Sequence, residues 1–447
     1  MRQFGFDRRT FKILLSGYII IALVGALLLS LDFTHTKPIS FLDAFFTSAS
    51  AVSMTGLIVK NTANDFTLYG QIIILALVQI GGLGYMGIGL FIYILIRKKV
   101  GFSGKNLLKE SLLYSSMDGL FNFFKKLLLF IAAIELTGTI LLFLRFSLEM
   151  DFGKALWFGF FHSVSAFNNS GFYILEHGLL EYKHDIIINL IFTSLIIIGG
   201  LGYFVIVELY FFQRKRLQSL SLHTKIVVFA TIFFTIFSTL IIFIFEYSNP
   251  NSIGDFSFLD KLIASYFTAV NFRTSGFNTL DMYYFKDASL FFGSLFMVIG
   301  GAPGGTAGGM KVTTVVVLVL YAYWSVKNGR VRIFGYEIPQ ETINKAFIIG
   351  VGSAVYIVIC TILLSLLESE MGFITLLFET SSAFATVGFS VGDGGSLSLC
   401  AKFSPISKII IIIMMLSGRI GVFAFFLSIF SQDKAIHISF PKGRVNL

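Results

Sequence analysis

Long apolar segments recur along the whole chain. A bilayer core about 30 Å thick is crossed by a helix of about 20 apolar residues. Eight segments approach or exceed that length: 12–31, 70–96, 126–144, 186–212, 225–245, 288–325, 343–366 and 406–430. The first follows Arg8, Arg9 and Lys12 but has no small-residue cleavage site before Asp32, so we expect a retained helix rather than a signal peptide. The pattern predicts an all-α polytopic membrane protein with eight transmembrane helices.

The expected helices form pairs, and each pair is separated by a segment too long and too apolar for a simple hairpin loop. The four segments read FFTSASAVSMTG (45–56), FFHSVSAFNNSG (160–171), SYFTAVNFRTSG (265–276) and LFETSSAFATVG (377–388). Aligned on the last glycine, the position ten before it is aromatic, the position eight before it carries a hydroxyl, and the position after it is large and apolar. Three such columns indicate four diverged copies of one unit.

A glycine pattern also recurs in the helix after each of these segments. It reads GGLG at 81–84 and 199–202, GG at 300–301 and GRIG at 418–421. We therefore expect four tandem repeats at 1–97, 98–212, 213–326 and 327–430, the third with a broken second helix. A cytoplasmic tail is expected at 431–447.

In each unit the sequence predicts a helix, a half-helix of about ten residues, an extended loop and a second helix. The half-helix is too short to cross the membrane, and non-helical backbone at membrane depth is tolerated only where protein or a water-filled cavity satisfies its polar groups. Four such loops around one pseudo-fourfold pore would direct carbonyl groups at a common centre, where they replace the hydration shell of a cation. The alternative is that the glycines only allow close packing. The predicted filter residues are Thr55, Gly56, Asn169, Ser170, Gly171, Thr274, Ser275, Gly276, Thr386, Val387 and Gly388.

The sixth apolar segment is interrupted by GGAPGGTAGGMK at 300–311. Each Gly costs about 1 kcal/mol and each Pro about 3 kcal/mol in a helix, so we expect an irregular loop. A phosphate-binding loop is excluded because Lys311 comes one residue late for that motif and no Ser or Thr directly follows it. We predict a gate, with a broken helix that does not move as the alternative. The predicted gate residues are Gly300, Gly301, Gly304, Gly305, Thr306, Ala307, Gly308, Gly309, Lys311 and Arg419.

Arg419 lies within the last apolar segment, where an ionised side chain is costly and faces a cavity or a partner. Filter carbonyls would be such a partner. The alternative is pairing with a buried acid, Glu135 or Glu208, and Lys311 has the same option.

Other charged side chains lie in or near the half-helices. We expect Asp43 and Glu379 near the outer mouth, where negative charge concentrates cations. For His162 and Arg273 we expect packing and hydrogen bonds that brace the loops.

Composition and charge agree with a membrane protein. The chain is 55% hydrophobic and 13% charged, with mean hydropathy +0.83, whereas soluble domains carry about 25% charge. Of the 34 Lys and Arg residues, 22 lie in the two termini and the connections between repeats or their halves that share one side. By the positive-inside rule this predicts a multi-pass plasma-membrane protein with both termini cytoplasmic, surrounded by lipid and not by nucleic acid.

The sequence offers little for catalysis. Two cysteines, Cys360 and Cys400, are too few for a disulfide framework or a metal cluster. No HExxH motif or nucleophile elbow occurs, so we do not expect an enzyme. A secondary transporter of an organic solute stays open as a less favoured alternative, since such proteins also use repeats and broken helices.

The loop motifs carry a resemblance to a known family. TGL at 55–57, NSGF at 169–172, RTSGF at 273–277 and TVGFS at 386–390, with the glycine-rich segment and Arg419, resemble the Trk/Ktr/HKT superfamily of cation transporters. The first helix begins almost at the N-terminus, leaving no room for the extra N-terminal helix pair of the Trk branch. The chain is thus most similar to a Ktr-type potassium uptake membrane subunit.

The resemblance implies potassium uptake, with potassium bound at the filter carbonyls and the loop at 300–311 as gate. It implies a homodimer with one pore in each protomer, docked on a cytoplasmic ring of nucleotide-binding regulatory subunits of the RCK/KTN type. Sodium is implied as an activator, and no organic cofactor is expected in this chain. Some sodium-favouring members carry serine in place of the first filter glycine, whereas this chain has Gly56. A sodium-permeable or sodium-coupled transporter is the alternative.

The connection at 97–126 and the tail are too short to fold a regulatory domain of typical size. Regulation is therefore expected from a separate protein, from ions or from voltage.

Overall fold

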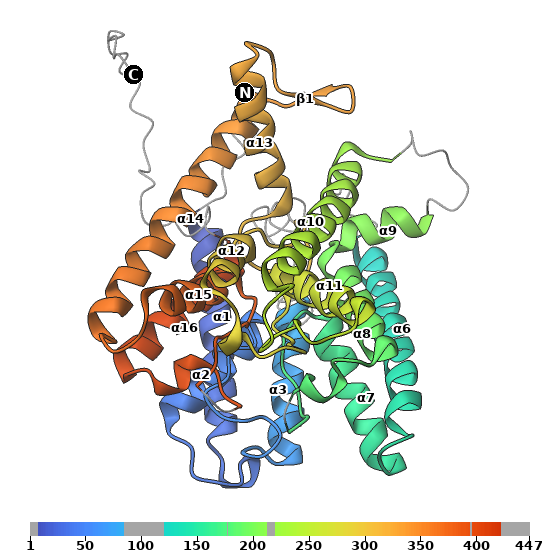
Figure 1. Ribbon diagram of the computed structural model, residues 1–447, viewed down its shortest axis with the longest axis vertical. Helices are drawn as coiled ribbons and strands as arrows, with labels where there is room; N and C mark the ends of the chain where they lie inside the picture. Colours follow the sequence, from blue (N-terminus) through green and yellow to red (C-terminus); the bar gives the residue numbers. More distant parts are fainter. Residues whose placement is uncertain (1–7, 85–119, 177, 212–219, 394–395, 422–447) are drawn as a thin grey trace.

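The computed structural model describes residues 8–84, 120–176, 178–211, 220–393 and 396–421, and its regular structure is almost entirely helical (Figure 1). Most of the expected connection at 97–126 and the whole tail at 431–447 lie outside the described residues, as do the ends of the second and eighth expected spans.

The elements follow the expected order of first helix, shorter helix and second helix in each unit. The first unit contains α1 (Arg8–Leu29), α2 (Phe41–Ser53) and α3 (Leu68–Gly82), and the second contains α6 (Leu120–Phe146), α7 (Phe152–Phe167), α8 (Ile186–Gly200) and α9 (Tyr203–Phe211). The third contains α10 (Leu222–Glu246), α11 (Phe258–Thr274), α12 (Asp287–Met297) and α13 (Val312–Val326), and the fourth α14 (Gln340–Leu367), α15 (Phe373–Ala385) and α16 (Pro405–Ile420).

Three described helices are long and apolar enough to cross a membrane by themselves. These spans are Leu127–Phe146, Leu222–Glu246 and Gln340–Leu367, and the bent pair α8 and α9 would be a fourth. Their outer faces carry large exposed apolar side chains such as Phe233 and Ile236 on α10 and Val355 and Ile362 on α14, as expected for helices that contact lipid. The molecule is a helical membrane protein, and its division into eight spans stays a prediction.

The half-helices are longer than expected. α2, α7, α11 and α15 have 13, 16, 17 and 13 residues, compared with the predicted ten or so. At about 1.5 Å per residue they measure roughly 20–26 Å, still less than a bilayer core of about 30 Å. Capping sets two of the starts, because the Ser40 side chain accepts the Asp43 N–H and the Ser257 side chain accepts the Asp260 N–H.

The span expected at 186–212 is not straight, because the helix breaks after Gly200. The axes of α8 and α9 differ by 102°. Gly202 adopts a positive φ of 86°, and main-chain groups at the break pair with the glycine-rich segment instead of with their own helix. The Ala302 N–H donates to the Gly200 carbonyl (3.0 Å), and the Tyr203 N–H donates to the Gly304 carbonyl (3.1 Å). The apolar pattern alone predicts an unbroken helix here, but hydrogen bonds to the glycine-rich segment replace the helical hydrogen bonds at the break.

A small hairpin projects with α13 and α14 from one end of the molecule (Figure 1). Its strands, β1 (Arg332–Ile333) and β2 (Tyr336–Glu337), are antiparallel. The two turn residues, Phe334 and Gly335, have φ of 51° and 83°, the left-handed pair that a tight two-residue hairpin requires.

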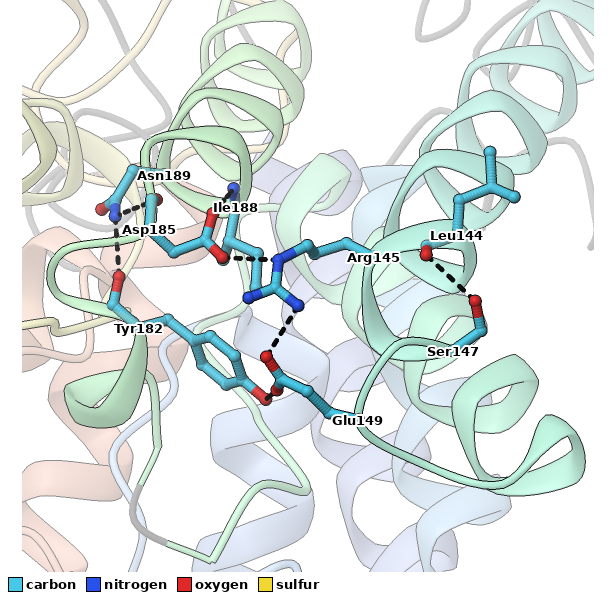
Figure 2. A network of polar contacts seen from close by, with 8 residues as sticks. All are labelled: Leu144, Arg145, Ser147, Glu149, Tyr182, Asp185, Ile188 and Asn189. Carbon is cyan, nitrogen blue, oxygen red and sulfur yellow. Dashed lines mark hydrogen bonds and ion pairs between the residues drawn. The ribbon is translucent and has the colours of Figure 1, made fainter.

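A polar network joins the end of α6 to the start of α8 (Figure 2). Arg145 pairs through Nη1 with Glu149 (2.7 Å) and through Nε with Asp185 (2.6 Å). Asp185 also accepts the Ile188 N–H and thereby caps α8. Tyr182 donates to Glu149 (3.0 Å), and burial together with that carboxylate raises the pKa of Tyr182, so the phenol keeps its proton. The network therefore fixes the two helices that flank α7.

Candidate functional site

The four repeat glycines lie in a closed ring. A Cβ atom on Gly56 would lie 3.0 Å from the Gly171 Cα, and one on Gly171 would lie 3.0 Å from the Gly276 nitrogen. A Cβ on Gly276 would lie 2.5 Å from the Gly388 carbonyl carbon, and one on Gly388 would lie 3.0 Å from the Gly56 Cα. Each glycine thus contacts the next in chain order and the last contacts the first. Backbone meets backbone at all four positions, at distances too short for a side chain.

Three of the four segments enter the ring through the same turn. The residue two before the glycine is left-handed in Met54 (φ 61°), Asn169 (φ 56°) and Thr386 (φ 52°). The glycines that follow also have positive φ, at Gly56 (87°), Gly171 (70°) and Gly388 (91°). The third segment differs, because α11 continues to Thr274 and Ser275 is extended with φ −155°. The ring is therefore pseudo-symmetric, with its third quarter built in another way.

Serines six residues before the glycine hold the turn, and the sequence analysis missed them. The Ser50 hydroxyl accepts the Gly56 N–H (3.1 Å), and the Ser382 hydroxyl accepts the Gly388 N–H (3.0 Å). In the second segment Ser165 hydrogen-bonds Ser170 (2.8 Å) and donates to the Phe172 carbonyl. The equivalent residue of the third segment is Val270. The sequence signal that could have revealed these serines is their recurrence at the same position in three of the four aligned segments.

The hydroxyl column eight residues before the glycine attaches the half-helices to their neighbours. Ser48 donates to the Ala22 carbonyl of α1 (2.7 Å), and Ser163 donates to the Glu135 carbonyl of α6 (2.6 Å). Thr380 and Thr361 of α14 share a hydrogen bond of 2.7 Å. In the third unit Thr268 bonds instead to Ala264 of its own helix (2.9 Å).

The glycines of the second helices serve close packing. A Cβ on Gly81, Gly199 or Gly418 would overlap the carbonyl oxygen of Val52, Phe167 or Phe384 respectively, each four residues before a ring glycine. Close packing between a helix and a half-helix thus describes these glycines, whereas each loop glycine contacts the neighbouring loop glycine around the ring.

A cavity of about 320 Å³ adjoins the ring. Three ring glycines, Gly56, Gly276 and Gly388, form part of its lining, and the acids Glu176 and Asp281 lie in its wall. Carboxylates at such a position attract cations.

Asp43 and Glu379 do not line this cavity, contrary to expectation. Asp43 pairs with Lys408 at 2.8 Å, which neutralises its charge locally. Glu379 is fully buried and accepts hydrogen bonds from residues that follow the fourth ring glycine. Tertiary partners, which the sequence does not reveal, thus remove both acids from the mouth.

The predicted gate segment packs against the ring segments. The Gly308 N–H donates to the Thr386 hydroxyl (3.1 Å), and the Thr306 N–H donates to the Gly199 carbonyl (3.4 Å). In the amide orientation that satisfies its neighbours, the Asn169 side-chain oxygen accepts from the Thr306 hydroxyl (3.0 Å). The segment thus touches the left-handed turn residues of the second and fourth units.

Arg419 reaches the same segment. Its guanidinium donates to the carbonyls of Thr306 and Gly81, the latter at 2.5 Å, and its side chain is buried. The partners are therefore carbonyls of the predicted gate segment and of α3, and not the filter carbonyls that the sequence led us to expect. Lys311 donates to the Ala307 carbonyl within its own segment (2.7 Å).

The two acids considered as alternative partners are engaged elsewhere. Glu135 accepts from Gln79 (3.3 Å) and Asn168 (3.0 Å). Glu208 accepts from Ser221 at its N–H and hydroxyl (2.7 Å each) and also from Thr224. Pairing of Arg419 or Lys311 with these acids is therefore not what the structure shows.

His162 and Arg273 make bracing hydrogen bonds, as predicted. The Ile174 N–H donates to His162 Nε2 (3.3 Å). Arg273 donates to Thr231 and Thr235 of α10, both at 3.3 Å. Among the described residues no three His, Cys, Asp or Glu side chains group as metal ligands, and Cys360 and Cys400 are buried free thiols.

Comparison with known proteins gives one family. The model of the family described as "TrkH: Cation transport protein" matches residues 8–438. The Ktr system potassium uptake protein B of Bacillus subtilis is 37% identical over 97% of this chain and 96% of its own length. The potassium/sodium uptake protein NtpJ of Enterococcus hirae is 33% identical over 92% and 90%.

A solved structure shares the fold. The potassium transporter TrkH from Vibrio parahaemolyticus superposes with a TM-score of 0.76 at 19% identity, covering 95% of this chain and 86% of that one. The resemblance drawn from the loop motifs is thus confirmed, and the chain belongs to the TrkH family of cation transport proteins.

Proposed function

We propose that this chain is the ion-conducting membrane subunit of a potassium uptake system, and that potassium passes through the ring of Gly56, Gly171, Gly276 and Gly388. The main support for this proposal is the closed ring of backbone, where a Cβ atom on any of the four glycines would lie 3.0 Å or less from a neighbouring backbone atom. Rings of backbone carbonyls bind cations by replacing their hydration shell. The names of relatives at 37% and 33% identity support potassium as the ion.

The segment 300–311 is the proposed gate. Its support is position and chemistry, because it touches Asn169 and Thr386 beside the ring and half of its residues are glycine. Glycine lowers the cost of changing backbone conformation. Arg419 anchors the segment through Thr306, and its positive charge raises the barrier to a passing cation.

We also propose how the chain assembles and how it is oriented in the membrane. The chain forms a homodimer in the plasma membrane with both termini cytoplasmic, and a ring of nucleotide-binding RCK/KTN-type subunits gates it. The basic residues Lys327, Arg330 and Arg332 near the hairpin suit the cytoplasmic side. Sodium acts as an activator, and no organic cofactor belongs to this chain.

A sodium-permeable or sodium-coupled transporter is the second candidate. The name of the NtpJ relative, a potassium/sodium uptake protein, favours it. Gly56 favours potassium, since the resemblance associates serine at that position with sodium.

Growth of a potassium-uptake-deficient bacterium at low potassium tests the function. We expect the chain, expressed with a Ktr-type regulatory subunit, to restore growth, and Gly56→Ser or Gly276→Ser to abolish growth or lower the ratio of potassium to sodium uptake. The added side chain would meet Ser170 or Gly388 backbone within 3 Å.

Gly153→Ser is the matched control, because nothing lies within 4 Å of a Cβ at that exposed position. It should behave as the wild type. Rescue with unaltered selectivity in both ring variants would reject the filter, and failure of the wild type to move either cation would reject the function.

A further inference from the structure

Two ionisable side chains occupy the same register in the second and fourth half-helices. His162 lies nine residues before Gly171, and Glu379 lies nine residues before Gly388. Both are fully buried. The equivalent residues of the first and third units, Thr47 and Phe267, are also buried but do not share the contact described next.

Each of the two side chains accepts a main-chain N–H three residues after the ring glycine. The Ile174 N–H donates to His162 Nε2 (3.3 Å), and the Val391 N–H donates to Glu379 Oε1 (3.2 Å). Ring order follows chain order, so the second and fourth segments face each other. In two opposite quarters of the ring, the chain after the glycine is thus attached to its own half-helix by the same type of hydrogen bond.

The geometry fixes the tautomer of His162. Nε2 accepts the hydrogen bond of the Ile174 N–H and therefore carries no proton, which leaves the ring proton on Nδ1, where the Phe158 carbonyl lies at 2.7 Å. The ring also lies about 6 Å from the rings of Phe146 and Phe192. The site therefore accepts an aromatic ring, and phenylalanine, whose six-membered ring is somewhat larger than imidazole, occupies the equivalent position 267 of the third unit.

The Glu379 carboxylate contacts two separate stretches of the chain. Ser390 donates to Oε1, and Cys400 Sγ lies 3.3 Å from Oε2. The Ser390 hydroxyl in turn accepts the N–H groups of Gly392 (3.0 Å) and Leu399 (2.7 Å). The carboxylate thus ties the chain after Gly388 to the returning segment at 399–400.

The same returning segment reaches the first and second units. Ser398 and Ile58 exchange two hydrogen bonds, at 2.9 and 3.0 Å, and the Tyr173 hydroxyl donates to the Ser396 carbonyl (3.4 Å). Ile58, Tyr173, Ser396 and Ser398 all line the cavity that adjoins the ring. The contacts of Glu379 therefore shape the cavity wall as well as the ring.

Burying an ionisable group among neutral donors costs free energy unless hydrogen bonds compensate. The described hydrogen-bond partners of Glu379 are all neutral, and they reach both of its carboxylate oxygens. We propose that His162 and Glu379 are positioning residues that fix the chain after Gly171 and Gly388, and through it the potassium selectivity of the ring. This inference rests on the proposed function.

Initial rates of potassium and sodium uptake in cells lacking other potassium uptake systems test it. His162→Phe keeps an aromatic ring, somewhat larger than imidazole, and removes the acceptor, and Glu379→Leu removes the carboxylate. Each should lower the ratio of potassium to sodium uptake about tenfold, the equivalent of one buried hydrogen bond worth about 1.4 kcal/mol. Glu379→Gln keeps an acceptor oxygen and should stay within about threefold of the wild type.

Thr47→Val is the matched control at the same register, since the partner of its hydroxyl among the described residues is the Asp43 carbonyl of its own helix (2.9 Å). Its ratio should equal that of the wild type. If Glu379→Leu does not reach the membrane, His162→Phe decides the outcome. A potassium-selective wild type with an unchanged ratio in His162→Phe would overturn the inference, whereas a wild type that moves no cation would reject the proposed function instead.

Discussion

At the scale of single residues, glycine has two different structural roles in this chain. The ring glycines bring backbone to backbone, and three of them have φ values of 70–91° that other residues rarely adopt. Gly81, Gly199 and Gly418 are buried against carbonyl oxygens and let a second helix approach a half-helix. The sequence shows both sets as glycines that recur at matching positions of the repeats, and only the contacts reveal that their roles differ.

Gly199→Ala tests the packing role apart from the ring. The added methyl group would overlap the Phe167 carbonyl, so α8 and α7 must separate. We expect a loss of roughly 1–3 kcal/mol in stability, the usual cost of overpacking, seen as a lower unfolding midpoint in detergent. Gly153→Ala is the control, and equal midpoints for the two variants would contradict the packing role.

At the scale of elements, the glycine-rich segment is the place where local preference and tertiary structure meet. Glycine and proline end α12 as predicted, and the loop then provides hydrogen-bond partners for main-chain groups at the break between α8 and α9. A helix break in the second unit is thus tied to a helix break in the third.

Deleting residues 304–308 tests the gate. The deletion removes Thr306, the acceptor of Arg419, and Gly308, the donor to Thr386. We expect higher basal cation flux in vesicles that contain the purified chain without its partner, because the barrier beside the ring is shortened. Flux equal to the wild type in vesicles of matched protein content would count against gating.

At the scale of the whole molecule, Arg419 connects three units. Lying in the fourth, it donates to Gly81 of the first and Thr306 of the third. Such a charge-assisted contact contributes about 1.5–3 kcal/mol, and the Arg419 side chain is buried.

Arg419→Gln keeps a donor and removes the charge, so we expect faster basal cation flux in vesicles with the fold retained. Arg330→Gln is the control, because that side chain is 83% exposed and, in the part of the chain that the structure describes, its ion pair is with Glu337 at the hairpin. A slower or unchanged flux in Arg419→Gln would contradict a barrier role for the charge.

The sequence by itself determined the membrane class, the half-helix positions, the aligned glycines and the interruption at 300–311, because hydropathy, glycine and proline act locally. It also supplied the hydroxyl column that attaches three half-helices. It did not show that α8 breaks at Gly200, that Glu379 and Asp43 leave the mouth, or that the third segment enters the ring by a different turn. Those outcomes depend on hydrogen bonds between residues up to hundreds of positions apart, such as Gly200 with Ala302 and Asp43 with Lys408. Tertiary structure decided them, because a buried polar group takes whichever partner the fold brings within reach.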